Sequence, residues 1–170
     1  IACRRGLLPE AEPEIGAALT EYFEIEGIRV RSGLEYRQIR ETEAGVVLNA
    51  LEDSGEVRLE AERVLIASGR RPNTEEMGLA EAGVVLLPNG GIEVDDRLRT
   101  TKADIYAAGD VTGRDQFVYM AAYGARIAAE NALNGDSRRY DNAAMPAVVF
   151  TDPQVASVGL TEAAAGQAGH

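Results

Sequence analysis

An acidic side chain and a helix start follow each other closely near the middle of the chain. The run from Thr100 to Gly113 predicts a short apolar strand that ends at Gly109-Asp110, and small residues predict a helix from about Phe117 to Asn134. The carboxylate of Asp110 can accept hydrogen bonds from sugar hydroxyls. The first amides of a helix carry partial positive charge and suit negative charge that builds up on a bound ring. We therefore expect a site for a ligand that has both a hydroxylated chain and an electron-rich ring.

A Gly-Asp pair alone is equally typical of a strand followed by a turn. The strand-loop-helix order, with Val118 eight residues beyond Asp110, resembles the second flavin-binding motif of the flavoprotein disulfide reductases, which have two dinucleotide-binding domains. The resemblance implies that Asp110 binds the ribitol of FAD and that the backbone N–H of Val118 meets the flavin near O2. Gly109, Gln116 and Phe117 complete the expected FAD site.

A second motif follows an expected apolar strand over Val64–Ala67. Gly69 lets the backbone approach a ligand closely, and Pro72 directs the chain out of a sheet. The stretch resembles the one that closes the NAD(P) domain of the same reductases. That resemblance implies a site beside the nicotinamide nucleotide for Ala67, Ser68, Gly69 and Arg70. A surface turn with solvated arginines is the alternative interpretation.

Two adjacent arginines, Arg4 and Arg5, follow what we interpret as the end of a strand. An acidic residue at this position would accept from the 2′-hydroxyl of NAD, whereas guanidinium groups pair with the 2′-phosphate of NADP. The pair therefore favours NADPH, although two neighbouring arginines also occur as solvated surface charge. By its position in the family, Ile39 is a candidate for the adenine pocket, while an apolar strand residue is also typical of a core.

Composition excludes several classes of partner. Acidic residues number 28 against 17 basic ones, and the net charge of −11 disfavours binding to nucleic acid or anionic membranes. No apolar run approaches the ~18 residues that span a bilayer, so we expect a cytoplasmic protein. The single cysteine, Cys3, cannot form an internal disulfide, and we interpret it as a small packing residue.

Local patterns predict an α/β fold. Apolar residues at helical spacing predict a helix over Pro13–Glu26, and Gly27 suits the residue that ends it. We then expect a small antiparallel excursion that returns to a parallel sheet. Its strands are predicted at Ile28–Arg31, Tyr36–Glu41, Val46–Leu51, Val57–Glu60 and Val64–Ala67.

The domain organisation follows from the resemblance. The stretch Ala144–Glu162 contains a predicted strand at Val148–Phe150 and a helix cap at Thr161, and it resembles the entry into an α+β dimerisation domain. We expect the later part of an NAD(P)-binding domain over 1–76, a second FAD-domain segment over 77–143, and the start of the dimerisation domain over 144–170. The whole protein is then expected to be a homodimer, of which this chain is a fragment cut at both ends.

Within this family, the ordered set of motifs is most similar to the mercuric reductases. That resemblance implies an enzyme that passes electrons from NADPH through FAD and a dithiol to Hg(II), because soft thiolates suit a soft metal ion. The chain has no cysteine pair, so we expect no catalytic or metal-binding residue within it and no activity of the fragment alone. Two alternatives remain: a dihydrolipoamide dehydrogenase-like reductase that uses NAD, and a non-enzymatic binding module.

Overall fold

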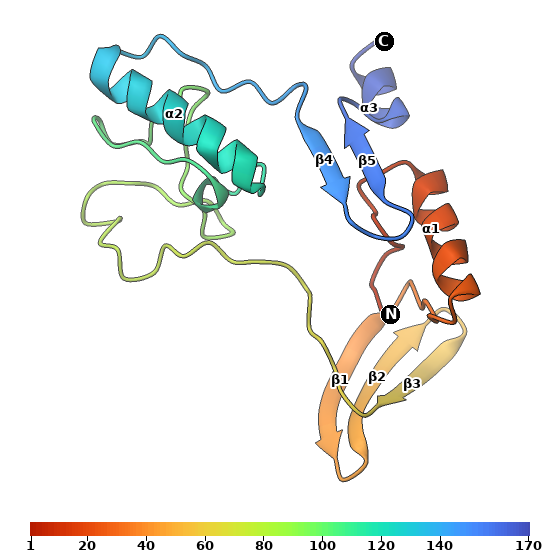
Figure 1. Cartoon of the computed structure of the whole chain (residues 1–170). Helices are drawn as coiled ribbons and strands as arrows, with labels where there is room; N and C mark the ends of the chain where they lie inside the picture. The colour runs from red at the N-terminus through yellow and green to blue at the C-terminus, as the bar shows by residue number, and fades with distance from the viewer. The chain divides into compact units, whose positions relative to one another are not determined.

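The computed structural model describes all 170 residues, which form two compact units. The first unit contains residues 1–67 and 146–170, and the second contains residues 68–145. Figure 1 shows the helices and strands of both. In chain order the elements are α1 (Pro13–Ile25), β1 (Glu35–Thr42), β2 (Gly45–Glu52), β3 (Gly55–Ala61), the 3-10 helix η1 (Asp110–Thr112), α2 (Val118–Asn134), β4 (Pro146–Val149), β5 (Val155–Val158) and α3 (Glu162–Gln167).

Helix α1 confirms the prediction from helical spacing to within one residue. Pro13 occupies its first turn, where no amide is needed, and Gly27 follows the last turn with φ 82°. Gly16 allows a close approach, since a Cβ there would lie 2.5 Å from the carbonyl oxygen of Leu7. Only Gly16 and Leu19 are buried, however, so much of the apolar stripe of this helix stays exposed or only partly covered.

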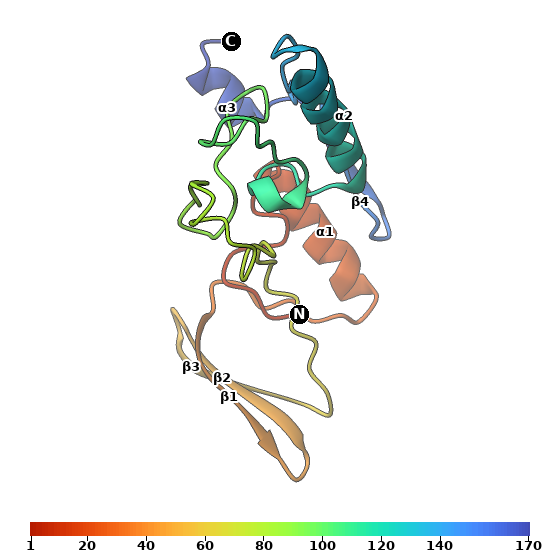
Figure 2. The same ribbon diagram turned by 90° about the vertical axis from the view of Figure 1, so that its left-hand side faces the viewer.

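Strands β1, β2 and β3 form the antiparallel excursion that the sequence predicts, with β2 in the centre. Both views show β1, β2 and β3 side by side in one layer (Figures 1 and 2). The buried side chains of β2, Val47 and Ala50, supply its contribution to the core. Strand β1 is exposed along almost its whole length, because only one of its edges is paired and neither face is covered.

Two backbone segments of the first unit pair in parallel at one place. The amide of Cys3 donates to the carbonyl of Arg31 at 2.9 Å, and the amide of Arg31 donates to the carbonyl of Ile1 at 2.8 Å. Ala2 and Arg31 form a parallel bridge. The strand expected over Ile28–Arg31 is therefore reduced to a bridge, since it has only this short partner.

The strand expected over Val64–Ala67 does not form. The segment is irregular, and Leu65 and Ile66 are 88% and 70% exposed. A strand needs a neighbour to satisfy its amides and carbonyls, and no segment of the chain pairs with this one. The prediction of a strand at Val64–Ala67 is therefore wrong for this chain.

The C-terminal segment forms a hairpin and a short helix. Strands β4 and β5 pair antiparallel, and Thr161 caps α3 by accepting a hydrogen bond from the amide of Ala164 at 3.2 Å. The predicted strand near Val148 and the predicted cap are confirmed. Strand β5 had no separate sequence prediction.

The second unit contains α2, which confirms the helix predicted from about Phe117 to Asn134. One buried cluster joins Ile127 and Ala128 of this helix to Leu98. The run from Thr100 to Gly109 is not a strand, contrary to expectation, because it makes only isolated bridges at Thr100 and Tyr106. Helix η1 follows immediately and leads toward α2.

Candidate functional site

Asp110 is the first residue of η1, and its side chain is exposed. The preceding residue, Gly109, has φ 81° and ψ −161°, a backbone conformation that only glycine adopts without strain. A Cβ at Gly109 would also lie 3.0 Å from the Cβ of Ala121 in α2. The glycine therefore lets the chain pass close to the helix and turn so that Asp110 begins η1.

The turn that carries Asp110 is closed by a buried threonine. The hydroxyl of Thr112, which is only 3% exposed, donates to the carbonyl of Gly109 at 2.9 Å. The amides of Thr112 and Gly113 donate to the carbonyls of Gly109 and Asp110, both at 3.0 Å. Gly113 then ends η1 in the left-handed conformation, with φ 69°. These bonds stabilise the turn that carries Asp110.

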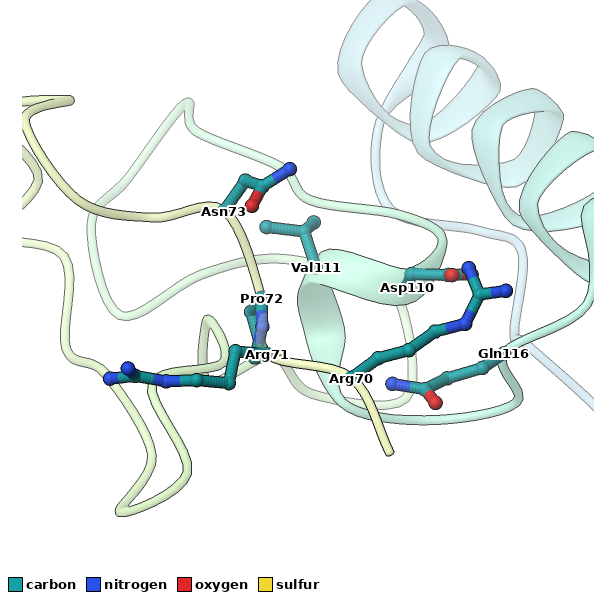
Figure 3. Close-up of a pocket in the computed structure, with 7 residues that line it drawn as sticks. All are labelled: Arg70, Arg71, Pro72, Asn73, Asp110, Val111 and Gln116. Carbon is teal, nitrogen blue, oxygen red and sulfur yellow. The ribbon is translucent and has the colours of Figure 1, made fainter. Parts of the chain in front are cut away.

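An open cavity of about 460 Å³ lies beside Asp110. Figure 3 shows the guanidinium of Arg70 turned toward the carboxyl of Asp110, with the carboxamide of Gln116 close to both, while Arg71 points away. The residues that line the cavity, all from the second unit, are Arg70, Arg71, Pro72, Asn73, Asp110, Val111 and Gln116. Carboxylate, carboxamide and guanidinium groups together can bind a ligand that is rich in hydroxyls and also carries negative charge.

The start of α2 lies a few residues beyond the cavity-lining Gln116. Phe117 precedes the helix in an extended conformation, with φ −129°, and no side chain caps the first turn. The amide of Ala121 is the first to bond within the helix, to the carbonyl of Phe117 at 2.9 Å. The amide of Val118 therefore has no partner inside the helix, and its side chain is 84% exposed. An uncapped helix start of this kind suits a ligand with negative charge.

Comparison with known proteins identifies the family. Residues 1–129 match the pyridine nucleotide-disulphide oxidoreductase family, and residues 145–170 match the dimerisation domain of the same family. The chain belongs to the pyridine nucleotide-disulphide oxidoreductases. Membership confirms the predicted fold class, a part of an FAD/NAD(P)-binding flavoprotein with the start of a dimerisation domain, and implies a flavin and a nicotinamide nucleotide as cofactors.

Curated relatives of this chain support the resemblance to mercuric reductases that its motifs indicate. A mercuric reductase from Streptomyces lividans is 41% identical over 169 residues, which are 99% of this chain and 36% of that protein. A mercuric reductase from Shigella flexneri is 43% identical over 173 residues, covering 97% of this chain and 29% of that protein. The resemblance to mercuric reductases is therefore confirmed, and the chain spans about a third of the length of these relatives.

Solved structures show the same relationship. The HOCl-induced flavoprotein disulfide reductase RclA from Escherichia coli superposes with a TM-score of 0.81 at 30% identity, covering 98% of this chain and 38% of that one. LpdA from Mycobacterium tuberculosis gives a TM-score of 0.86 at 30% identity, covering 99% of this chain and 36% of that one. At this identity and score the arrangement of the backbone is shared with flavoprotein disulfide reductases.

The residues expected to bind the nicotinamide nucleotide fall in different parts of the oxidoreductase chain. Arg4 lies over the ring of Tyr36 at 5.5 Å, and Arg5 pairs with Glu10 at 2.7 Å, both on the surface of the first unit. Ile39 is in β1 and is 46% exposed, so it is not a core residue. Ala67, Ser68 and Gly69 lie in the exposed irregular segment, where Gly69 has φ 111°.

Arg70, which the resemblance implies beside the nicotinamide nucleotide, lines the same cavity as Asp110 and Gln116. Four further residues line this cavity and were not assigned to a site from the sequence: Arg71, Pro72, Asn73 and Val111. The signal for Asn73 was present, because it belongs to the motif that follows Gly69.

Nowhere in the chain do three or more His, Cys, Asp or Glu side chains gather closely enough to hold a metal ion. None of its helices combines the length and apolar character needed to cross a membrane.

Proposed function

We propose that this chain is part of an FAD- and NADPH-dependent oxidoreductase that reduces Hg(II) to Hg(0). The observation that carries the proposal is the exposed carboxyl of Asp110 in an open cavity, followed within eight residues by an uncapped helix start. These two features together suit a ligand that has a sugar-alcohol chain and an electron-rich ring.

The residues of the second unit fit a flavin dinucleotide. Asp110 would accept hydrogen bonds from the ribitol hydroxyls, and Gln116 offers a carboxamide donor and acceptor in the same cavity. The amide of Val118, with Phe117 before it, would face the pyrimidine side of the ring, while Gly109 keeps the turn close to α2. The flavin, when bound, supplies hydride acceptance and onward electron transfer. These residues orient it, and the helix start favours negative charge on the ring.

For the second cofactor we propose NADPH. Arg4 and Arg5 are exposed, so their guanidinium groups are accessible to a 2′-phosphate. Arg5 already pairs with Glu10, which makes Arg4 the stronger candidate, because Arg4 contacts the ring of Tyr36 and makes no ion pair. Ile39, Ala67, Ser68, Gly69 and Arg70 are proposed to line the rest of the nucleotide site.

Hg(II) as the electron acceptor rests on the mercuric reductases at 41% and 43% identity. Thiolate pairs are the ligands that suit this ion, and the chain contains a single cysteine, Cys3. We therefore propose that residues 1–170 alone do not reduce Hg(II), and that the cysteine pairs belong to other parts of the whole protein. Residues 144–170 are proposed to begin its dimerisation domain, after segments 1–76 and 77–143 of the two nucleotide-binding domains.

A disulfide substrate is the second candidate function. The structural relative RclA is named as a flavoprotein disulfide reductase, and its backbone superposes on 98% of this chain. The two functions separate in steady-state kinetics of the full-length protein, where NADPH oxidation is measured with Hg(II) in excess thiol and, in parallel, with a disulfide. Turnover with the disulfide alone would contradict mercury reduction.

The FAD site is tested by Asp110→Ala in the full-length protein. Loss of the carboxylate removes a charged acceptor, worth roughly 1–3 kcal/mol for each bond, so the Kd for FAD should rise about 5- to 150-fold. Glu81→Ala is the matched control, because Glu81 is an exposed acid of the same unit that does not line the cavity. Unchanged flavin content of Asp110→Ala after dialysis would overturn the assignment.

A further inference from the structure

Asp115 lies in the short loop between η1 and α2 and accepts hydrogen bonds from two residues that follow α2. The phenol of Tyr140 donates to its Oδ2 at 2.9 Å. The carboxamide of Asn142 donates to both carboxyl oxygens, at 2.9 and 3.2 Å. The loop is therefore tied to a segment 25 to 27 residues away along the chain.

Tyr140, which donates the hydrogen bond to Asp115, is itself packed and hydrogen-bonded within the second unit. Its ring lies against Gly124 of α2, where a Cβ would come within 3.3 Å of Cε2, and it is 5.4 Å from the ring of Tyr123. Its amide donates to the carbonyl of Asp96 at 2.7 Å. Burial, together with the hydrogen bond to Asp115, raises the pKa of the phenol, which therefore remains a donor at neutral pH.

The loop is short and is also anchored from its other side. The guanidinium of Arg114 donates to the carbonyl of Val94 at 2.7 Å. The carbonyl of Asp115 accepts from the amide of Phe117 at 2.9 Å, immediately before α2 begins. Gln116 lies between these anchors and lines the cavity beside Asp110. Its backbone direction is therefore set by the bonds that its two neighbours make.

We propose that Asp115 is a positioning residue for the flavin, acting through Gln116 and the first amides of α2. Tyr140 and Asn142 hold the Asp115 carboxyl, and this carboxyl holds the loop in the conformation that presents Gln116 and the amide of Val118. The inference rests on the proposed FAD site. Without the hydrogen bonds from Tyr140 and Asn142 to Asp115, the loop would gain conformational freedom, and FAD binding would have to remove it again. The affinity for FAD would therefore fall even though no group that contacts FAD is lost.

A reciprocal exchange in the full-length protein tests this role. Asp115→Asn keeps one acceptor oxygen but replaces the other with an NH2 group, which loses the negative charge and one of the two bonds from Asn142, and Asn142→Asp leaves two carboxylates facing each other. Each single variant should raise the Kd for FAD about tenfold, which corresponds to the loss of one charged hydrogen bond. The double variant Asp115→Asn/Asn142→Asp restores a donor opposite an acceptor and should return the Kd to within about threefold of wild type. The visible absorption bands of the bound flavin should shift in the single variants and return in the double variant.

The matched control is Arg139→Gln. Arg139 belongs to the same segment, but its ion pair is with Asp96 and not with the flavin loop. It should leave the Kd for FAD unchanged. Single variants with wild-type affinity, a double variant no better than the weaker single one, or an equal loss in Arg139→Gln would each overturn the positioning role. Asp110→Ala separates this from the cofactor assignment: if it weakens FAD binding while the exchange series does not, only the role of Asp115 fails.

Discussion

Gly109 and Ala121 are in such close contact that a single methyl group added to Gly109 would lie 3.0 Å from the Cβ of Ala121. This contact joins the turn that carries Asp110 to the second turn of α2. The positions of the carboxyl and of the helix start are thus coupled through one short backbone approach. Neither feature can shift without moving the other or opening a gap between them.

Gly109→Ala should therefore weaken FAD binding as well as stability in the full-length protein. The substitution introduces backbone strain of about 1–3 kcal/mol and the close contact with Ala121. Gly135→Ala is the control, because Gly135 also has a positive φ of 77° but has no atom within 4 Å of the added Cβ. Urea midpoints should fall for both variants, whereas the Kd for FAD should rise only for Gly109→Ala. Equal FAD affinity in the two variants would contradict the coupling.

Arg4→Ala should change coenzyme preference. If Arg4 pairs with the 2′-phosphate, its loss should raise the KM for NADPH roughly 10- to 100-fold, in line with about 1.5–3 kcal/mol for a hydrogen bond to a charged group. The KM for NADH should stay the same, since NADH lacks that phosphate. Arg63→Ala is the control, because Arg63 is exposed in the same unit and bonds only to the neighbouring carbonyl of Glu62. Parallel changes with both coenzymes would argue against a phosphate contact.

Tyr140 should give the full-length protein a specific alkaline sensitivity. Burial and the hydrogen bond to Asp115 raise the pKa of its phenol in the folded state above the ordinary value of about 10. The stabilisation is therefore complete below about pH 10 and is lost as the pH rises from there toward the folded pKa. The difference in urea midpoint between wild type and Tyr140→Phe should be constant from pH 7 to about pH 9 and should shrink above about pH 10. A difference that does not depend on pH would contradict this role for the phenol.

Asn131→Asp should destabilise the second unit strongly. Asn131 is 1% exposed, and its amide nitrogen donates to the carbonyls of Arg97 and Arg138, both at 2.9 Å. An aspartate would turn an oxygen toward these two carbonyls and leave them without a donor, at a cost of about 2–4 kcal/mol. Asn134→Asp, at the exposed end of the same helix, should cost less than about 1 kcal/mol. The urea midpoints of the two variants in the full-length protein provide the comparison, and similar midpoints would show that the Asn131 bonds matter little.

The helices were predictable because their signals are local. Pro13 and Gly27 bracket α1 within the sequence itself, and α2 begins one residue from the predicted start. The three-stranded excursion was also predictable, since each of its antiparallel pairs is joined by a short turn. The apolar run near Leu65 was misjudged because strand formation depends on a partner, and hydrophobicity alone does not supply one.

The cavity beside Asp110 was only half predictable. The motif around Gly109 and the spacing to Val118 marked the carboxyl and the helix start as features of one site. That Arg70 turns toward the same carboxyl depends on how residues 40 positions apart approach each other, which no local pattern encodes. The hydrogen bond from Tyr140 to Asp115 could not be predicted from the sequence for the same reason.

The sequence by itself determined the family, the two main helices and the acid at position 110, because each depends on short-range patterns of residue type. Tertiary structure decided which side chains share the cavity, which apolar segments stay uncovered, and how the loop before α2 is held. Those outcomes depend on contacts between distant segments. Such contacts form only where burial and hydrogen bonding together outweigh the loss of chain entropy.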